Sequence, residues 1–317
     1  MIDFIARRLI AIVPVLTIVA VLIFMMLRLT PGDPAAVIAG DNATSDQIAD
    51  IREKLGLNLP LWQQFGIWIG NILQGNFGES FFFKKTVAEL IAQRIEPTLA
   101  LGICTIAFAI VVAVPIGVMA AYKQGSLFDR CVMGFAVIGF SVPGFVIGYC
   151  LIYVFAIELG WLPVQGYKPL WGRGAEGLWG WMRQLILPWT ALGLIYIALI
   201  ARVTRASVSE SLTEDHIRTA RAKGLSEVRV LLRHALAHAA VPIVTVIGIG
   251  VALLIGGVVV TETVFAIPGL GSLTVDAVLN RDFPVIQGLV LLFSLSYVLI
   301  NLLVDSSYVW LDPRIRH

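Results

Sequence analysis

The 317-residue sequence is poor in charge. Only 14% of its residues are charged, whereas 58% are hydrophobic. An ordinary globular chain carries about 25% charged residues, and a soluble fold of this size exposes too much surface for so few. The net charge of +2 is also too small to indicate a nucleic-acid partner. The composition therefore excludes a soluble protein and predicts one that lies in a membrane.

Cysteine is scarce as well. Cys104, Cys131 and Cys150 lie within or at the ends of apolar runs and share no repeated spacing. This pattern favours small packing residues over disulfides or metal ligands. His234 and His238 could share a helical face, but no third ligand lies near them in the sequence, so we expect no metal site.

Two further absences concern energy. The chain contains no Gly-Lys-Ser or Gly-Lys-Thr sequence, so it has no P-loop and we do not expect it to hydrolyse ATP itself. The centres of its apolar runs hold no ionisable residue, although ion-coupled transporters usually place such residues there. An ion-gradient-driven secondary transporter therefore becomes the alternative hypothesis, together with a membrane component that transports nothing.

Six apolar runs are present, and each is long enough to cross a bilayer core of ~30 Å, which takes about 20 residues. The first follows two arginines, but it is longer than a signal-peptide core and no small-residue cleavage site follows it. The sequence therefore predicts six transmembrane helices, the first of them uncleaved. They cover residues 9–27, 98–122, 131–157, 185–201, 240–260 and 285–309.

The distribution of Lys and Arg predicts the orientation. With the N-terminus inside, the inner segments hold thirteen of the 23 basic residues. Six others fall in or beside the first outer loop, which exceeds the length at which the positive-inside rule applies, and four remain outside. Both termini are therefore expected in the cytoplasm.

The long first loop, residues 30–97, has helical periodicity at 45–55 and at 61–73. Trp62, Phe65 and Trp68 in the second segment suit either a helix on the membrane surface or a cap packed on its own spans. The loop at 158–184 holds four of the eight tryptophans. They are typical of an interfacial belt, and contacts with a substrate or a docking protein are the alternative.

Small residues and prolines lie inside the predicted spans. Pro115 and Pro143 each remove a helical hydrogen bond and permit a bend. Small residues four apart let another backbone approach closely. The candidate helix-packing positions are Gly144, Gly148, Gly248, Ala252 and Gly256.

The longest inner segment contains a predicted elbow at 213–239. Thr213 begins one helix as a cap, and Gly224 is well placed for a left-handed C-cap. Ser226 then begins a second helix that leads to the fifth span. A plain cytosolic connection and a projecting docking knob with basic flanks are both compatible with this pattern.

Within the elbow, residues 214–226 (Glu-Asp-His-Ile-Arg-Thr-Ala-Arg-Ala-Lys-Gly-Leu-Ser) closely resemble the cytoplasmic signature of permease subunits of bacterial ABC importers, in the dipeptide, oligopeptide and nickel branch. Further segments resemble that branch in the same order along the whole chain. They are residues 29–34, 75–80, 94–99, 201–206, 264–271, 281–288 and 312–316.

The resemblance implies an all-α, six-helix type I ABC importer permease bundle with a long first periplasmic loop, in the bacterial inner membrane. It implies residues 1–94 as the first span and periplasmic loop, 95–306 as the transmembrane domain with its coupling elbow, and 307–317 as a cytoplasmic tail. The implied partners are a homologous second permease subunit, two cytoplasmic ABC ATPases, a periplasmic substrate-binding protein and membrane lipid, with no nucleic acid. The chain itself would be non-catalytic and would hold no cofactor, because ATP-Mg binds to the ATPases.

In such importers the elbow is a coupling helix that sits in a groove of the ATPase. Ala220 and Gly224 match the general importer pattern, whereas Arg218 and Thr219 depart from it and the closing proline is displaced to Pro242. The implied ATPase-docking residues are Arg218, Thr219, Ala220, Arg221, Ala222, Lys223, Gly224, Leu225 and Ser226.

The substrate is left open by the sequence. Peptides are the largest class in the branch, and glutathione, nickel complexes, opines and sugars are the variants. The binding protein does most of the selecting in this family. Few polar residues are available to line a pathway, namely Thr105, Ser141, Thr190, Tyr196, Thr245 and Ser294.

Overall fold

The computed structural model describes residues 2–29, 33–39, 44–54, 56–172 and 174–311. In this part of the chain the regular structure is helical, apart from one isolated antiparallel bridge between Glu79 and Thr86. The chain forms two compact units, Met1–Glu96 with Ser272–Leu299 and Pro97–Gly271 with Ile300–His317. The expected division at residues 94 and 95 stays a prediction.

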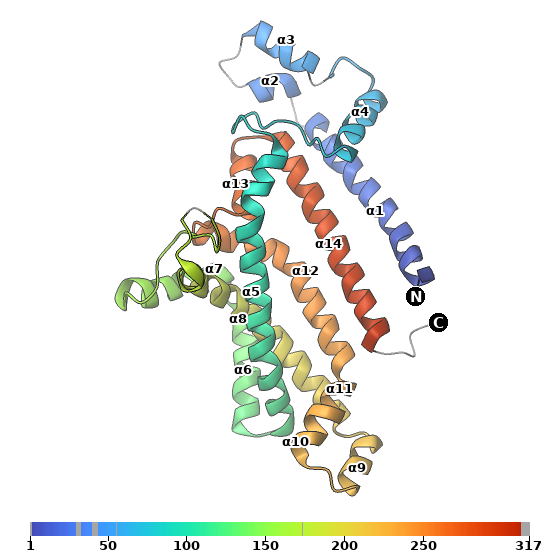
Figure 1. The fold of residues 1–317 in the computed structure, drawn as a ribbon, viewed down its shortest axis with the longest axis vertical. Coiled ribbons are helices and arrows are strands. Elements are labelled where there is room, and N and C mark those ends of the chain that lie inside the picture. Colours follow the sequence, from blue (N-terminus) through green and yellow to red (C-terminus); the bar gives the residue numbers. More distant parts are fainter. Residues whose placement is uncertain (1, 30–32, 40–43, 55, 173, 312–317) are drawn as a thin grey trace. The chain divides into compact units, whose positions relative to one another are not determined.

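Unit 1 begins with α1 (Ile2–Leu29), α2 (Pro34–Ala39), α3 (Ser45–Lys54) and α4 (Leu61–Leu73). It also contains the start of α5 (Val87–Tyr122), the end of α13 (Leu270–Leu279) and most of α14 (Phe283–Leu311). α1 lies beside α14, where the Gln287 Nε2 donates to the Ile23 carbonyl at 3.1 Å (Figure 1). The helices expected in the long loop are α3 and α4, whereas α2 was not expected.

The aromatic face of α4 packs on α1. The buried Phe24 ring contacts those of Phe65 and Trp68, with centroids 5.2 and 5.6 Å away. Trp62, on the same helix, is exposed. Of the two interpretations of this helix, these contacts are those of a cap packed on its own span.

Unit 2 contains the rest of α5, and then α6 (Leu127–Ser141), α7 (Gly144–Leu151), the π-helix η1 (Ile152–Glu158) and α8 (Gly177–Ser211). The elbow follows as α9 (Asp215–Ala222), α10 (Glu227–Arg229), the π-helix η2 (Val230–Ala235) and α11 (Leu236–His238), before α12 (Ala240–Val264). α8 contacts α6, α7 and α12 and supplies much of the buried core. α8 is therefore the central helix of this unit.

In the described residues, five helices are long and apolar enough to span a membrane, and six if one bent pair counts as a span. That pair is α6 with α7 and η1, bent by 103°, where the sequence predicts a span at 131–157. Pro143 cannot donate a backbone hydrogen bond, and it drives Val142 into an extended conformation with φ −93° and ψ 125°. α6 alone is about 22 Å long, which is shorter than a bilayer core of about 30 Å.

The fourth span also differs from its predicted bounds. Residues 185–201 were expected, but α8 has 35 residues and Pro188 lies inside it. The helix continues past Arg202, the point at which the apolar run stops. Its last turns are held by Arg205, which binds Asp129 of α6 through Nε at 3.0 Å and Nη2 at 2.8 Å. An ion pair with a buried carboxylate thus stabilises the part of α8 that lies beyond the apolar run.

The helix α14 reaches Leu311, so the expected tail at 307–317 begins inside a helix. The segments that resemble the importer branch are called matched segments below. Residues 312–317, which include the matched segment 312–316, lie outside the described residues, as do residues 30–32 of the matched segment 29–34.

Candidate functional site

One face of α9 packs against the rest of unit 2 and anchors the elbow there. Ile217 and Ala220 are buried, and they join an apolar cluster with Val118 of α5, Val208 of α8 and Val230 of η2. The other six of the eight residues of α9 are exposed. They are Asp215, His216, Arg218, Thr219, Arg221 and Ala222. α9 therefore presents a polar surface to the outside and is fixed to the ends of two long helices behind it.

Gly224 forms the corner of the elbow. Its φ of +77° is in the left-handed region, as the predicted C-cap requires. Its N–H donates to the Arg221 carbonyl at 2.9 Å, and no atom lies within 4 Å of the position that a Cβ would take. The corner therefore requires glycine for its backbone conformation and not for space.

An ion pair crosses this corner. Arg221 donates to Glu227 through Nε at 2.9 Å and Nη2 at 3.1 Å. Arg221, one of the implied ATPase-docking residues, is therefore already paired within the chain. Lys223 makes no ion pair among the described residues, and Arg218 lies 3.3 Å from Asp215 in a highly exposed pair.

The caps of the elbow helices differ from those expected. Glu214, not Thr213, occupies the N-cap of α9, because the Thr213 Oγ1 donates back to the Glu210 carbonyl at 2.7 Å. Ser226 is the N-cap of α10, but its side chain makes no capping hydrogen bond. Local back-bonding of Thr213 therefore replaces the side-chain cap that the sequence pattern suggested for the first helix of the elbow.

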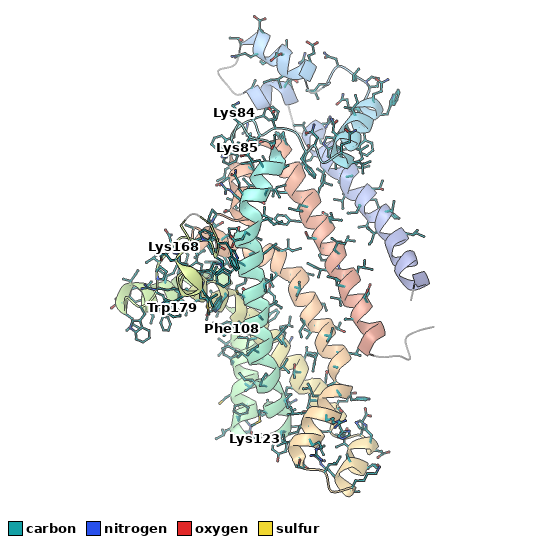
Figure 2. All side chains as sticks on the ribbon, viewed as in Figure 1. Lys84, Lys85, Phe108, Lys123, Lys168 and Trp179 are labelled. Atoms are coloured by element: carbon teal, nitrogen blue, oxygen red, sulfur yellow. The ribbon has the colours of Figure 1, made fainter. Side chains whose placement is uncertain are left out.

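Two apolar side chains at the elbow are exposed. Val228 and Leu232 lie four residues apart after the corner, while the neighbouring Leu231 is buried in the apolar cluster. Figure 2 shows Lys123, which follows α5, at the same end of this unit, whereas Lys168 and Trp179 lie away from it. The exposed pair adds an apolar patch to a surface that is otherwise polar.

Two histidines contact each other within the elbow, but they are not the His234 and His238 pair that the spacing suggested. His216 and His238 have ring centroids 5.0 Å apart, and the His216 Nδ1 lies 3.2 Å from the Glu214 Oε2. His238 is 3.7 Å from the same oxygen. Within the described ranges, no group of three or more His, Cys, Asp or Glu residues is arranged to hold a metal ion.

In unit 1, a fully buried carboxylate joins two of the matched segments. Asp282 accepts hydrogen bonds from the Ser80 hydroxyl and from the Phe82 N–H at 3.2 Å. The Ser80 Oγ accepts in turn from the Phe83 N–H at 2.8 Å. Residues 75–80 and 281–288 thus meet, although about 200 residues separate them. The sequence identified both segments but assigned no role to either residue.

A second buried carboxylate organises unit 2. Glu262 accepts from the Thr98 Oγ1 at 2.6 Å, and the same hydroxyl accepts from the Leu270 N–H at 2.8 Å. A Cβ on Gly269 would overlap the carboxylate, and one on Gly271 would lie 2.9 Å from its Oε2. The matched segment 264–271 therefore wraps around Glu262, a residue that no sequence motif singled out.

The candidate packing residues fall into two groups. A Cβ on Gly144 or Gly148 would lie 3.1 Å from Ile195 or 3.3 Å from Phe265, and one on Gly248 would overlap Val304. In contrast, Gly256 has no atom within 4 Å of a Cβ, and Ala252 is half-buried. The close approaches of α12 to α8 occur instead at two glycines that the spacing rule missed. They are Gly250, where an added Cβ would lie 3.3 Å from Tyr196, and Gly257, where one would lie 2.9 Å from Leu192.

The polar residues considered for a pathway are mostly bonded to their own helices. The hydroxyls of Ser141, Thr245 and Ser294 each donate to the carbonyl four residues earlier. Thr105 is fully buried, and its hydroxyl has no hydrogen-bond partner among the described residues. Tyr196 is buried against Gly250, and Thr190 is half-buried. In the part of the chain that the structure describes, no hydrogen bond joins any two of these six residues.

Comparison with known protein families gives two matches that cover almost the whole chain. Residues 113–317 match the family described as binding-protein-dependent transport system inner membrane component. Residues 1–102 match the N-terminal family of the membrane component of the same transport systems.

Similar whole proteins carry related names. A probable peptide ABC transporter permease of Sinorhizobium fredii is 53% identical over 99% of both chains. A putative peptide transport system permease of Brucella abortus is 44% identical over 99% of this chain and 98% of its own. The glutathione transport system permease protein GsiC of Escherichia coli is 44% identical over the full length of both.

Among solved structures, the inward-facing MetNI methionine ABC transporter contains a similar chain. The TM-score is 0.58 at 19% identity, and the match covers 70% of this chain and 96% of the other. At that identity the likeness concerns the fold, which is that of a type I importer permease bundle.

Proposed function

The chain belongs to the binding-protein-dependent transport system inner membrane components, and from this membership we propose that it forms one half of a translocation pathway for peptides. It is the permease subunit of an ABC importer and a multi-pass inner membrane protein, so it works with ATPases and a binding protein. The proposal adds a homologous second permease, two ATPases, and termini that face the cytoplasm.

The observation that carries the mechanism is the anchored elbow. α9 is fixed to the ends of α5 and α8 through Ile217 and Ala220, while its other face is free for a partner. The Arg221–Glu227 ion pair joins α9 to α10 across the Gly224 corner. A push on the exposed face would therefore move the elbow as one body, and the helix ends behind it would follow.

The docking surface has a polar and an apolar part. Arg218, Thr219 and Lys223 supply the exposed polar side, and Val228 and Leu232 supply the apolar side. An ATPase groove with acidic groups near its rim and an apolar floor would complement both. ATP-Mg binds in the ATPases, so this chain needs neither a catalytic residue nor a cofactor of its own.

Peptides are the substrate class that the relatives favour. The names of the Sinorhizobium and Brucella proteins refer to peptide transport, and GsiC is named for glutathione, itself a short peptide. The chain offers no cluster of His or carboxylates in the described spans that would suit a free metal ion. We therefore propose short peptides or a closely related solute as the cargo.

The test is copurification followed by an ATPase assay. The tagged chain is extracted in mild detergent from cells that express its native operon. Two ATPases and a second permease should copurify, and a periplasmic protein loaded with peptide should stimulate hydrolysis. A chain that purifies alone, with uptake that stops when the proton gradient is dissipated at constant ATP, would contradict the proposal.

A further inference from the structure

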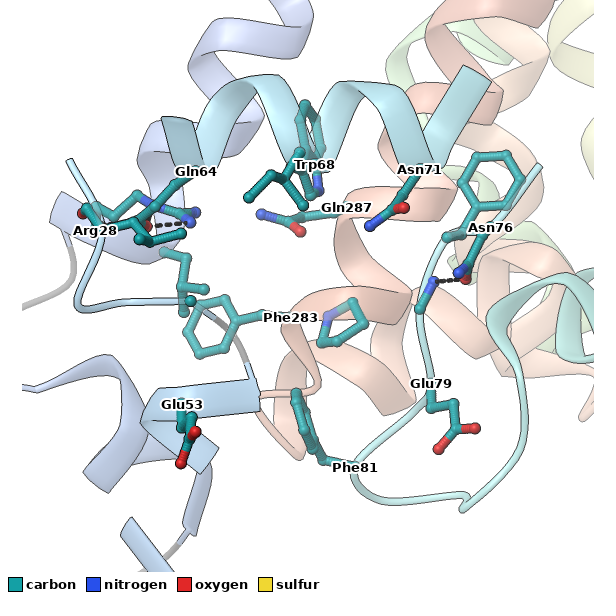
Figure 3. A pocket seen from close by; sticks show the side chains of 17 residues that line it. Arg28, Glu53, Gln64, Trp68, Asn71, Asn76, Glu79, Phe81, Phe283 and Gln287 are labelled. Atoms are coloured by element: carbon teal, nitrogen blue, oxygen red, sulfur yellow. Dashed lines mark hydrogen bonds between the residues drawn. The ribbon is translucent and has the colours of Figure 1, made fainter. Parts of the chain in front are cut away.

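Unit 1 contains a cavity of about 580 Å³ (Figure 3). Its walls come from the end of α1, from Glu53 of α3 with Gly56 and Leu59 after it, from α4, from residues 76–81 and from the start of α14. Two of these walls belong to the matched segments that Ser80 and Asp282 bring together. The cavity is therefore built on a hydrogen-bonded frame and not on a loose loop.

A buried amide faces this cavity. Gln287 is only 7% exposed, and its Nε2 donates to the Ile23 carbonyl. Its Oε1 accepts no hydrogen bond from the residues that the structure describes. Asn71 lies on the wall next to it, and the Asn76 Oδ1 already accepts from the Gly78 N–H at 3.0 Å (Figure 3). A buried side chain whose acceptor is left open at the cavity favours a ligand that donates a hydrogen bond.

The charges of the lining favour a cation. Glu53 and Glu79 line the cavity and make no ion pair among the described residues. Arg28, the one base in the lining, is already engaged: it donates to the Gln64 Oε1 at 2.8 and 3.2 Å and to the Phe24 carbonyl at 3.0 Å. Two carboxylates against one guanidinium leave a net negative charge.

Aromatic rings complete the lining. Trp68, Phe81 and Phe283 all border the cavity, and aromatic faces attract cations and the aliphatic stems that carry them. The chain itself shows this chemistry at one end of the cavity, where the Arg28 guanidinium lies 3.6 Å from the centroid of the Phe24 ring. Acceptors, acidic groups and rings are the features that a Lys or Arg side chain would use.

We propose that this cavity receives a lysine or arginine side chain of the periplasmic binding protein when that protein docks. The inference rests on the proposed function, which places the loop at residues 30–97 on the periplasmic side. The partner is the binding protein and not the free cargo, because the cavity is built by that outer loop and the adjoining ends of α1 and α14.

The test uses the complete importer in lipid nanodiscs and its purified binding protein. The readout is the concentration of binding protein that gives half-maximal stimulation of ATP hydrolysis. Glu79→Lys and Glu53→Lys reverse the charge of the lining, and Asn71→Trp fills the cavity. Each should raise that concentration at least tenfold. Copurification of the ATPases with every variant checks that the importer is assembled.

Matched controls lie on the same helices outside the cavity. Asp46→Lys makes the same charge change on α3, and Gln74→Trp adds the same ring three residues beyond Asn71, at the C-cap of α4. Both should stay within twofold of the unmodified importer. The proposal is wrong if the three cavity variants also stay within twofold.

A second arm separates the binding protein from the cargo. Surface Lys and Arg residues of the binding protein are changed to Glu one at a time, and one such change should restore docking to the Glu79→Lys importer. A failure of all of them would overturn the proposal, as would competition by an excess of free basic dipeptide in the unmodified importer. If the unmodified importer shows no stimulation at all, the proposed function fails instead.

Discussion

Arg221 and Glu227 form a two-point ion pair across the Gly224 corner, with N–O distances of 2.9 and 3.1 Å. Both side chains are partly exposed, and such pairs contribute about 0–1 kcal/mol to stability. Their importance is therefore mechanical, because they hold α9 against α10 while the apolar cluster holds α9 against the long helices behind it.

The first prediction concerns this pair. Glu227→Gln should lower peptide uptake at unchanged expression and leave the thermal midpoint of the importer almost unaltered. The reason is that α9 and α10 would move separately when the ATPase pushes on the elbow. The measurement is the number of peptides taken up per ATP hydrolysed in proteoliposomes. Arg221→Glu with Glu227→Arg should recover part of the loss, and Asp215→Asn, in the more exposed neighbouring pair, is the control. Equal uptake per ATP in all variants would contradict the idea.

The second prediction concerns the corner itself. Gly224→Val should uncouple transport, because a β-branched residue in the left-handed region costs about 1–2 kcal/mol where the ATPase must seat. Gly224→Asn is the matched variant, since Asn tolerates that region far better, and no neighbouring atom excludes its side chain. Uptake should fall strongly with Val and moderately with Asn. Similar uptake in both strains would show that the conformation is unimportant.

Local features of the fold could be predicted from the sequence. The bounds of α4 agree with the predicted 61–73, and the positive φ at Gly224 agrees with the predicted cap. Both depend on neighbours within a few residues, such as aromatic spacing or a glycine after basic residues. The long apolar runs likewise identified five of the six expected spans as long apolar helices, because length and hydropathy largely decide them, whereas the run at 131–157 is a bent pair of helices.

Features that depend on distant residues could not be predicted. Nothing near Asp282 in the sequence indicates that it binds Ser80, and nothing near Glu262 indicates Thr98. The 103° bend at Pro143 also exceeds what a proline alone implies, because the direction of a helix after a break depends on the helices that it packs against. The glycines of α12 show the same limit. Spacing singled out Gly256, where an added Cβ would have no atom of the described chain within 4 Å, and passed over Gly257.

The third prediction concerns the frame of unit 1. Asp282→Ala should leave the buried Ser80 hydroxyl unpaired, at about 1–3 kcal/mol, and two partly buried backbone amides as well, each at a smaller cost. The importer should therefore unfold at a clearly lower temperature in a thermal-shift assay. Asp276→Asn, which alters a half-exposed carboxylate 3.6 Å from Arg94, should shift the midpoint far less. Comparable shifts in the two variants would mean that Asp282 does not hold the loop.

The fourth prediction concerns the wrapping of segment 264–271 around Glu262. Gly269→Ala should destabilise the protein by several kcal/mol, because the new Cβ would overlap a fully buried carboxylate that cannot move without losing its bond to Thr98. Gly256→Ala is the matched control, since α12 leaves the space around Gly256 open and alanine favours a helix by about 1 kcal/mol over glycine. Thermal midpoints in nanodiscs measure both. If Gly269→Ala in combination with Glu262→Ala recovers stability over Gly269→Ala alone, the overlap with the carboxylate is the cause. A double variant that is worse than either single one would show instead that Glu262 and Gly269 stabilise the segment independently.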